Sequence, residues 1–122
     1  MKLRFFKGEF SVCRLRDLSN LDLSRDLFFF AKTQDELSLV CSSLEIPANA
    51  VRVESGWRMF RIEGQLDFGL VGILAKITGV LAAHGLSVFA VSTFDTDYIL
   101  IKADGLDQAR VALAEAGYEM EA

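Results

Sequence analysis

Residues 86–103 read LSVFAVSTFDTDYILIKA and predict a β-hairpin. Residues 86–94 are rich in β-branched and aromatic side chains, and residues 98–103 are apolar in the same way, which is typical of strands. Asp95, Thr96 and Asp97 lie between the two runs and are residues that turns favour. The hairpin is the centre from which the rest of the fold is predicted.

A strand and then a helix are predicted before the hairpin. Residues 57–63 alternate between two faces, as a strand does. Asp67 stands where a helix N-cap is expected, and Gly85 stands at the residue after the helix, where a left-handed backbone is common. The side chains with helical spacing between them are Leu70, Ile73, Leu74, Ile77, Val80, Leu81 and His84.

A second helix and a last strand are predicted after the hairpin. Asp104 and Asp107 are acidic residues at a helix start, and Gly117 ends that helix. Its apolar stripe consists of Leu106, Ala109, Leu113 and Ala116. Residues 118–120 are expected to form an edge strand. The order is β-α-β-β-α-β, so we predict an α+β fold with a ferredoxin-like split β-α-β unit over residues 56–122.

Residues 1–55 predict a β-rich half that follows the same order with its helices shortened. Strands are expected at 9–15, 27–33, 37–42 and 51–53. Residues 17–25 lack a two-turn apolar stripe, so no full helix is expected there. Two hypotheses remain open: an internal duplication, or a single extended sheet in which the N-terminal strands are added at an edge. Ten phenylalanines favour sheet-to-sheet pairing of the halves or of two chains.

Composition excludes several classes of protein. The net charge of the 122 residues is −4, which argues against sequence-independent binding of nucleic acid, because such binding needs lysine and arginine at phosphates. Charged residues interrupt every window of about 18 residues, so no membrane span is expected. No apolar h-region with a small-residue cleavage site follows the basic start, so no signal peptide is expected. Cys13 and Cys41 lie in strand-like runs and are expected to be buried free thiols of a cytoplasmic protein.

No constellation of catalytic or metal-binding residues is apparent. The chain has one histidine, His84, no Cys-x-x-Cys motif and no phosphate-binding glycine motif, so we expect no metal, no cofactor and no enzymatic activity. His84 is expected to interact with the C-terminus of its helix. A small hydrolase and an RNA-binding use of this fold are disfavoured, because the loop at 64–69 is acidic and only Lys102 is basic near Phe89 and Tyr98.

Three segments carry a resemblance to a known family. They are Gly56-Trp57-Arg58, the loop and helix start from Gly64 to Leu74, and Ser92 to Leu100. They resemble the small bacterial tandem ACT-domain proteins, a group similar to the animal arginine-sensor ACT family. The first half resembles the degenerate N-terminal ACT half of that group in outline. The resemblance implies a ligand-binding regulatory protein, with an amino acid held at an interface between two ACT domains, a homodimer, and output through another protein or through oligomerisation.

The resemblance also implies a site between the hairpin and the loop before the first helix of a facing ACT unit. It carries over to Asp67, Phe68, Gly69, Thr93, Phe94 and Asp97. The chemistry of these residues agrees with such a site. Backbone N–H groups at the start of the helix favour a carboxylate, Asp97 suits an ammonium group, and Thr93 and Phe94 offer a hydroxyl and an apolar wall.

Structural roles compete with each of these assignments. Asp67 is also an expected N-cap, Gly69 and Gly72 also permit close packing of helix on sheet, and Asp97 is also a turn residue. Phe94 is also suited to a core or an interface. The alternative function is an ACT-like dimerisation or partner-docking module that binds no small molecule, with Phe28, Phe29 or Phe30 buried at a protein interface.

Overall fold

The computed structural model describes residues 1–63 and 72–121 and divides the chain into two compact units. The C-terminal unit consists of Met1–Lys7 and Arg58–Ala122, and the N-terminal unit consists of Gly8–Trp57. The predicted halves, 1–55 and 56–122, differ from these units mainly in the first seven residues. These residues belong with the C-terminal unit because β1 (Lys2–Phe5) pairs with two of its strands.

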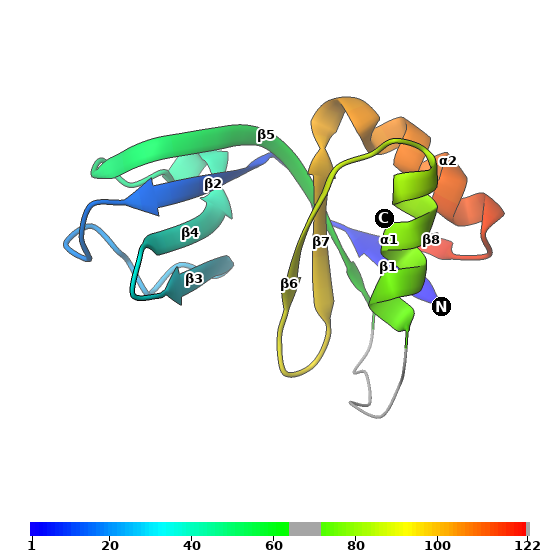
Figure 1. Ribbon diagram of the computed structural model, residues 1–122, viewed down its shortest axis with the longest axis horizontal. Helices are drawn as coiled ribbons and strands as arrows, with labels where there is room; N and C mark the ends of the chain where they lie inside the picture. Colours follow the sequence, from blue (N-terminus) through cyan, green and yellow to red (C-terminus); the bar gives the residue numbers. More distant parts are fainter. Residues whose placement is uncertain (64–71, 122) are drawn as a thin grey trace. The chain divides into compact units, whose positions relative to one another are not determined.

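The C-terminal unit is a ferredoxin-like α+β fold, as predicted (Figure 1). Its other elements are the end of β5 (Ala50–Ile62), α1 (Ile73–Ala83), β6 (Val88–Ser92), β7 (Asp97–Lys102), the 3₁₀ turn η2 (Ala103–Gly105), α2 (Leu106–Glu115) and β8 (Glu119–Glu121). The sheet order is β6-β7-β5-β1-β8. The unpredicted strand β1 therefore lies between the first and last strands of the split unit, antiparallel to β5 and parallel to β8.

The core of this unit lies between the sheet and the two helices. The α1 side chains of Ile77 and Leu81 and the α2 side chains of Ala109 and Leu113 are fully buried, as their helical spacing predicts. They belong to one cluster with strand residues, which are Leu3, Phe5, Phe60, Ile62, Ile99 and Ile101. The alternation of Lys2–Phe5 explains why β1 joins the sheet, since Leu3 and Phe5 both point into this core.

Helix α1 begins later than the sequence predicted. Its first residue is Ile73, and its N-cap is Gly72 with φ 79°, a left-handed conformation that an α-helix cannot continue through. The expected start near Phe68 with Asp67 as N-cap is therefore wrong for this helix. The end of α1 is as predicted. Gly85 has φ 71° and His84 Nδ1 lies 3.0 Å from the carbonyl oxygen of Val80 in the last turn.

The N-terminal unit is a four-stranded antiparallel sheet of order β3-β4-β2-β5. Its elements are β2 (Phe10–Leu15), β3 (Phe28–Lys32), β4 (Leu37–Ser42), the 3₁₀ turn η1 (Ser43–Glu45) and the first part of β5. Residues 8–57 contain no α-helix, so the unit is β-rich as predicted. Two strands were expected at 51–53 and 57–63, but β5 is continuous. Gly56 with φ 85° accommodates an irregularity in the pairing with β2 instead of ending the strand.

The two units share a hairpin with matching bounds. Sixty residues separate Phe28 from Val88 and Leu37 from Asp97, the first residues of equivalent strands. The turns also match: Thr33 N donates to Glu36 O at 3.0 Å, and Thr93 N donates to Thr96 O at 2.8 Å. In each turn, the threonine Oγ1 accepts the N–H three residues later, at 3.1 and 3.3 Å. These shared features support the hypothesis of an internal duplication.

The two cysteines are buried and free, as expected. Cys13 on β2 is 1 % exposed and Cys41 on β4 is 3 % exposed. Burial, together with the neighbouring Cys13, raises the pKa of the Cys41 thiol to about 12. Since the thiolate is the reactive form, Cys41 is protonated and poorly reactive at neutral pH.

A buried hydrogen bond ties the β6–β7 turn to the end of β5. Thr96 is 7 % exposed, and its Oγ1 donates to the carbonyl oxygen of Ile62 at 2.9 Å. Thr96→Val keeps the shape and removes the donor, so we expect a loss of about 1–2 kcal/mol in the free energy of unfolding, measured by urea denaturation. Thr78→Val is the matched control, because Thr78 Oγ1 bonds to helical carbonyls of α1. Equal stability of the two variants would contradict the prediction.

Candidate functional site

Thr93 serves as a structural residue of the β6–β7 turn. Its Oγ1 donates to Thr96 O at 3.0 Å and accepts from Thr96 N at 3.3 Å. The hydroxyl is thus used in both directions by the turn. A role for Thr93 in binding would rest on the backbone position that it holds or on the second lone pair of its hydroxyl.

Asp97 is held in place by its cross-strand neighbour. Ser92 and Asp97 are opposite each other where β6 and β7 begin to pair, and Ser92 Oγ donates to Asp97 Oδ1 at 2.6 Å. Asp97 is half-buried. The hydrogen bond fixes the rotamer of the carboxylate and leaves a negative charge at the base of the turn, which suits an ammonium group.

Phe94 projects from the turn and is 73 % exposed. It is therefore not a core residue of the C-terminal unit. An exposed aromatic ring at a turn is suited to contact with a ligand or with another protein surface. Both of the remaining sequence hypotheses, ligand wall and interface, agree with this position.

The N-terminus of α1 offers backbone donors to an anion. The N-cap of α1 is Gly72, which offers no side-chain hydrogen bond to the first N–H groups of the helix. A cavity of about 260 Å³ lies beside this terminus and is lined in part by Gly72, Ile73 and Lys76. The remaining predicted site residues, Asp67, Phe68 and Gly69, lie outside the described residues.

The topology brings the turn and the helix terminus to one edge of the sheet. In a β-α-β unit the helix starts at the edge where the first strand ends, and the second parallel strand ends at that same edge. Accordingly, the β6–β7 turn and the start of α1 lie at the same end of the unit in Figure 1. The bond from Thr96 to Ile62 holds the turn beside the end of β5. Thr93, Phe94, Asp97 and the start of α1 thus lie at the same end of the unit (Figure 1).

Two residues that support this arrangement were missed in the sequence. Ser92 orients Asp97, and Thr96 anchors the turn. The repeated pattern Thr33-x-Asp35 and Thr93-x-Asp95, sixty residues apart, marks the turn through Thr93 but carries no signal for Ser92 or Thr96. A threonine that bonds two backbone groups across a tight turn marks a rigid hairpin, which neither apolar periodicity nor composition reveals.

Other kinds of site and segment were sought in the described residues. No group of three or more histidine, cysteine, aspartate or glutamate side chains in 1–63 and 72–121 is placed to hold a metal ion. Neither of the α-helices described is long and apolar enough to cross a membrane.

Comparison with known proteins adds a family match. The family model described as "ACT domain" matches residues 52–115. The human protein named Cytosolic arginine sensor for mTORC1 subunit 1 is 36 % identical over 86 residues, which are 65 % of this chain and 26 % of that protein. The chain thus spans about a quarter of the length of the curated relatives it matches.

Solved structures show the same fold over the whole chain. Protein Atu0741 from Agobacterium tumefaciens is 31 % identical with a TM-score of 0.84, covering 98 % of this chain and 91 % of its own. The regulatory subunit of aspartate kinase from Thermus thermophilus has a TM-score of 0.62 over 96 % of this chain and 97 % of its own. At 11 % identity, that second likeness concerns the fold alone.

Proposed function

Because the chain belongs to the ACT-domain family, we propose that it is a regulatory protein that binds an amino acid and has no catalytic activity of its own. A relative whose name describes an arginine sensor supports this role. We further propose that it acts in the cytoplasm, as the human relative's name says of that protein.

The proposed ligand site lies at the sheet edge formed by the β6–β7 turn and the start of α1. The Asp97 carboxylate, held by Ser92 at 2.6 Å, is the observation that carries the proposal. It would pair with the ammonium group of the ligand, while N–H groups at the start of α1 would receive the carboxylate. Phe94 would contact the ligand's apolar part. We assign Asp67, Phe68 and Gly69 to the same site, on the segment that leads to α1.

We also propose that the site is completed by a second ACT unit, in a homodimer. The exposure of Phe94 supports this, because a ring that is 73 % exposed in one unit gains burial when another unit covers it. The matching hairpins of the two units support the proposal that the chain itself is a tandem of two ACT-like halves.

A thermal-shift screen with the twenty amino acids at millimolar concentration tests the function. A ligand at a hundred times its Kd stabilises the folded protein by about 2.7 kcal/mol, which raises the Tm by several degrees. We expect one or a few compounds to do so in a saturable way. Arginine is the first compound to test, since a relative is named as an arginine sensor. No shift with any amino acid would contradict the proposal.

A docking or dimerisation module without a small-molecule ligand is the second candidate, favoured by the exposure of Phe94. Its predicted interface of Phe28, Phe29 or Phe30 has less support, since Phe28 and Phe30 pack against the core of their own unit. A stable dimer by light scattering, together with an empty ligand screen, would favour this candidate.

A further inference from the structure

The N-terminal unit contains a cavity that is separate from the proposed amino-acid site. Its volume is about 220 Å³, and it lies over Phe28, Leu39 and Cys41 of β3 and β4. In the C-terminal unit the equivalent sheet face is covered by α1 and α2. Here only the connection before β3 and the turn after β4 cover it, so the face is incompletely filled. Leu21, Leu44, Ile46 and Pro47 complete its apolar lining.

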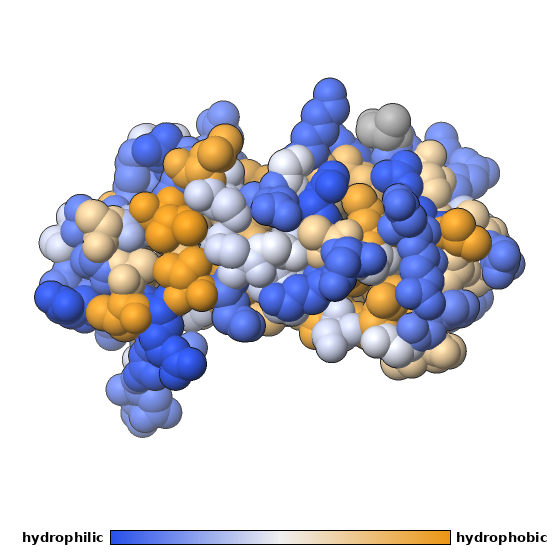
Figure 2. All heavy atoms as spheres, turned by 90° about the horizontal axis from the view of Figure 1, so that it is seen from above, coloured by the Kyte–Doolittle hydropathy of each residue, from blue (hydrophilic) through white to orange (hydrophobic). Residues whose placement is uncertain are grey.

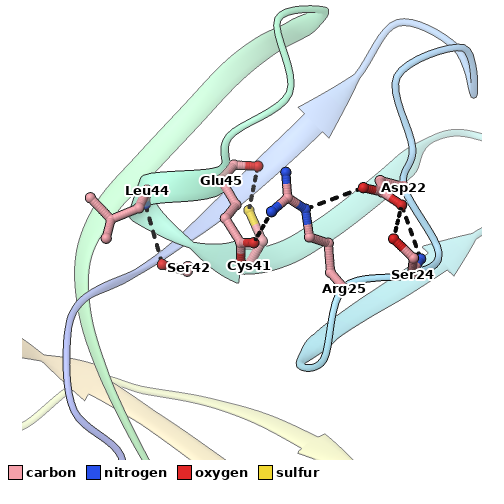
Figure 3. A network of polar contacts seen from close by, with 7 residues as sticks. All are labelled: Asp22, Ser24, Arg25, Cys41, Ser42, Leu44 and Glu45. Atoms are coloured by element: carbon pink, nitrogen blue, oxygen red, sulfur yellow. Dashed lines mark hydrogen bonds and ion pairs between the residues drawn. The ribbon is translucent and has the colours of Figure 1, made fainter.

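Two carboxylates at this cavity hold a guanidinium group between them (Figure 3). Arg25 Nη1 lies 2.6 Å from Glu45 Oε2, and Arg25 Nε lies 3.3 Å from Asp22 Oδ2. The pair with Glu45 joins the connection before β3 to η1. All three charged residues line the cavity, and together they carry a net charge of −1.

The carboxylate of Asp22 is pre-oriented by its own loop. The hydroxyl and the backbone N–H of Ser24 donate to Asp22 Oδ1 at 2.6 and 3.0 Å. These bonds, the hydroxyl first, lower the pKa of Asp22 below its ordinary value. Asp22 therefore stays charged and in position whether or not Arg25 is beside it, since neither bond involves Arg25.

The ion pairs of Arg25 are open to solvent. The side chains of Arg25 and Asp22 are 53 % and 52 % exposed, and that of Glu45 is 29 % exposed. Surface ion pairs of this kind contribute little net stability, because water competes for both charges. Another cation can thus replace the guanidinium at modest cost, whereas an anion would face two carboxylates.

We propose that this cavity is a binding site for a small organic cation with a short apolar stem. Its ammonium or guanidinium end takes the place of Arg25 between Asp22 and Glu45, and its stem lies against Phe28, Leu39 and Ile46. The cavity volume of about 220 Å³ is below the range of about 300–1,000 Å³ for pockets that hold drug-sized molecules, so the cavity fits a smaller ligand. Arg25 then acts as an internal occupant that the ligand displaces.

The surroundings of the cavity favour entry from solvent. Leu44, which is 95 % exposed, and the half-buried Leu21 belong to its lining. Figure 2 shows apolar side chains among polar ones on the surface of this unit.

Titration of the ¹⁵N-labelled full chain with n-butylguanidinium chloride tests the proposal, with sodium butyrate as an anionic probe that also has a short apolar stem. We expect saturable shifts of the Leu21, Leu44 and Ile46 amides with the cation alone. Arg25→Ala should bind it about two- to fivefold more tightly than the wild type, because the weak internal competitor is gone. Adding Glu45→Gln to that variant should weaken binding at least tenfold.

The control for the charge change is Glu36→Gln in the Arg25→Ala background, because Glu36 is exposed in the same unit and does not line the cavity. It should bind as Arg25→Ala does. Arg25→Gln provides a second opened site should Arg25→Ala fold poorly. The proposal is overturned if neither opened variant binds more tightly than the wild type, if butyrate binds equally well, or if Glu45→Gln and Glu36→Gln have the same effect.

Discussion

Asp97→Ala is expected to abolish the thermal shift that the amino-acid ligand gives the wild-type protein. Once a ligand covers the turn, the Asp97 carboxylate and the ligand's ammonium group form a desolvated, hydrogen-bonded ion pair. Removing one partner of such a pair costs about 2–5 kcal/mol, or roughly thirtyfold to several-thousandfold in Kd. The measurement is the Kd by isothermal titration, with far-UV circular dichroism to verify the fold.

Asp95→Ala is the matched control, since it removes the same charge from the same turn. Asp95 is exposed two residues away and does not pair with Ser92 in the ladder. Its variant should keep a Kd within a few-fold of the wild type. Unchanged affinity in Asp97→Ala would remove Asp97 from the site, whereas equal losses in both variants would indicate a general electrostatic effect.

Phe60→Ala is expected to cause the largest loss of stability. Phe60 on β5 is fully buried and stacks on Phe5 of β1, with ring centroids 4.8 Å apart. Truncating a buried phenylalanine removes apolar burial and leaves a cavity, at a cost of about 3–5 kcal/mol. Since small domains are stable by only about 5–15 kcal/mol, the change should be plain in a urea denaturation curve.

Val111→Ala serves as the comparison for Phe60→Ala, because Val111 is 58 % exposed on α2. Its effect should be within about 0.5 kcal/mol. A loss below about 1 kcal/mol for Phe60→Ala would mean that β1 and β5 rearrange to fill the space. The stacking of Phe5 on Phe60 would then not be the main contact that holds β1 in the unit.

Much of the C-terminal unit follows from local patterns. The hairpin at residues 86–103 and the stripes of both helices were predicted because side chains alternate every two residues in strands and recur about every 3.6 residues in helices. The late start of α1 was missed for a local reason as well. The apolar stripe in the sequence begins at Leu70, but α1 begins at Ile73, directly after the left-handed Gly72.

The site was predictable only in part. Asp97 and Phe94 attract notice as a charged and an aromatic residue in a turn, whereas Ser92 and Thr96 are ordinary strand and turn residues until the hairpin closes. Asp22, Arg25 and Glu45 carry no pattern that sets them apart from a solvated charged surface. Arg25 and Glu45 form an ion pair only because the connection before β3 folds against η1.

The sequence by itself determined the type and order of most elements, the buried cysteines and the turn that carries Asp97, because each depends on residues close together in the chain. Only the tertiary structure placed β1 between β5 and β8 and joined Arg25 to Glu45. Four alternating residues at the start of the chain can pair with any open strand edge. Which edge they join depends on the core that Leu3 and Phe5 enter, and that core is assembled from residues more than fifty positions away.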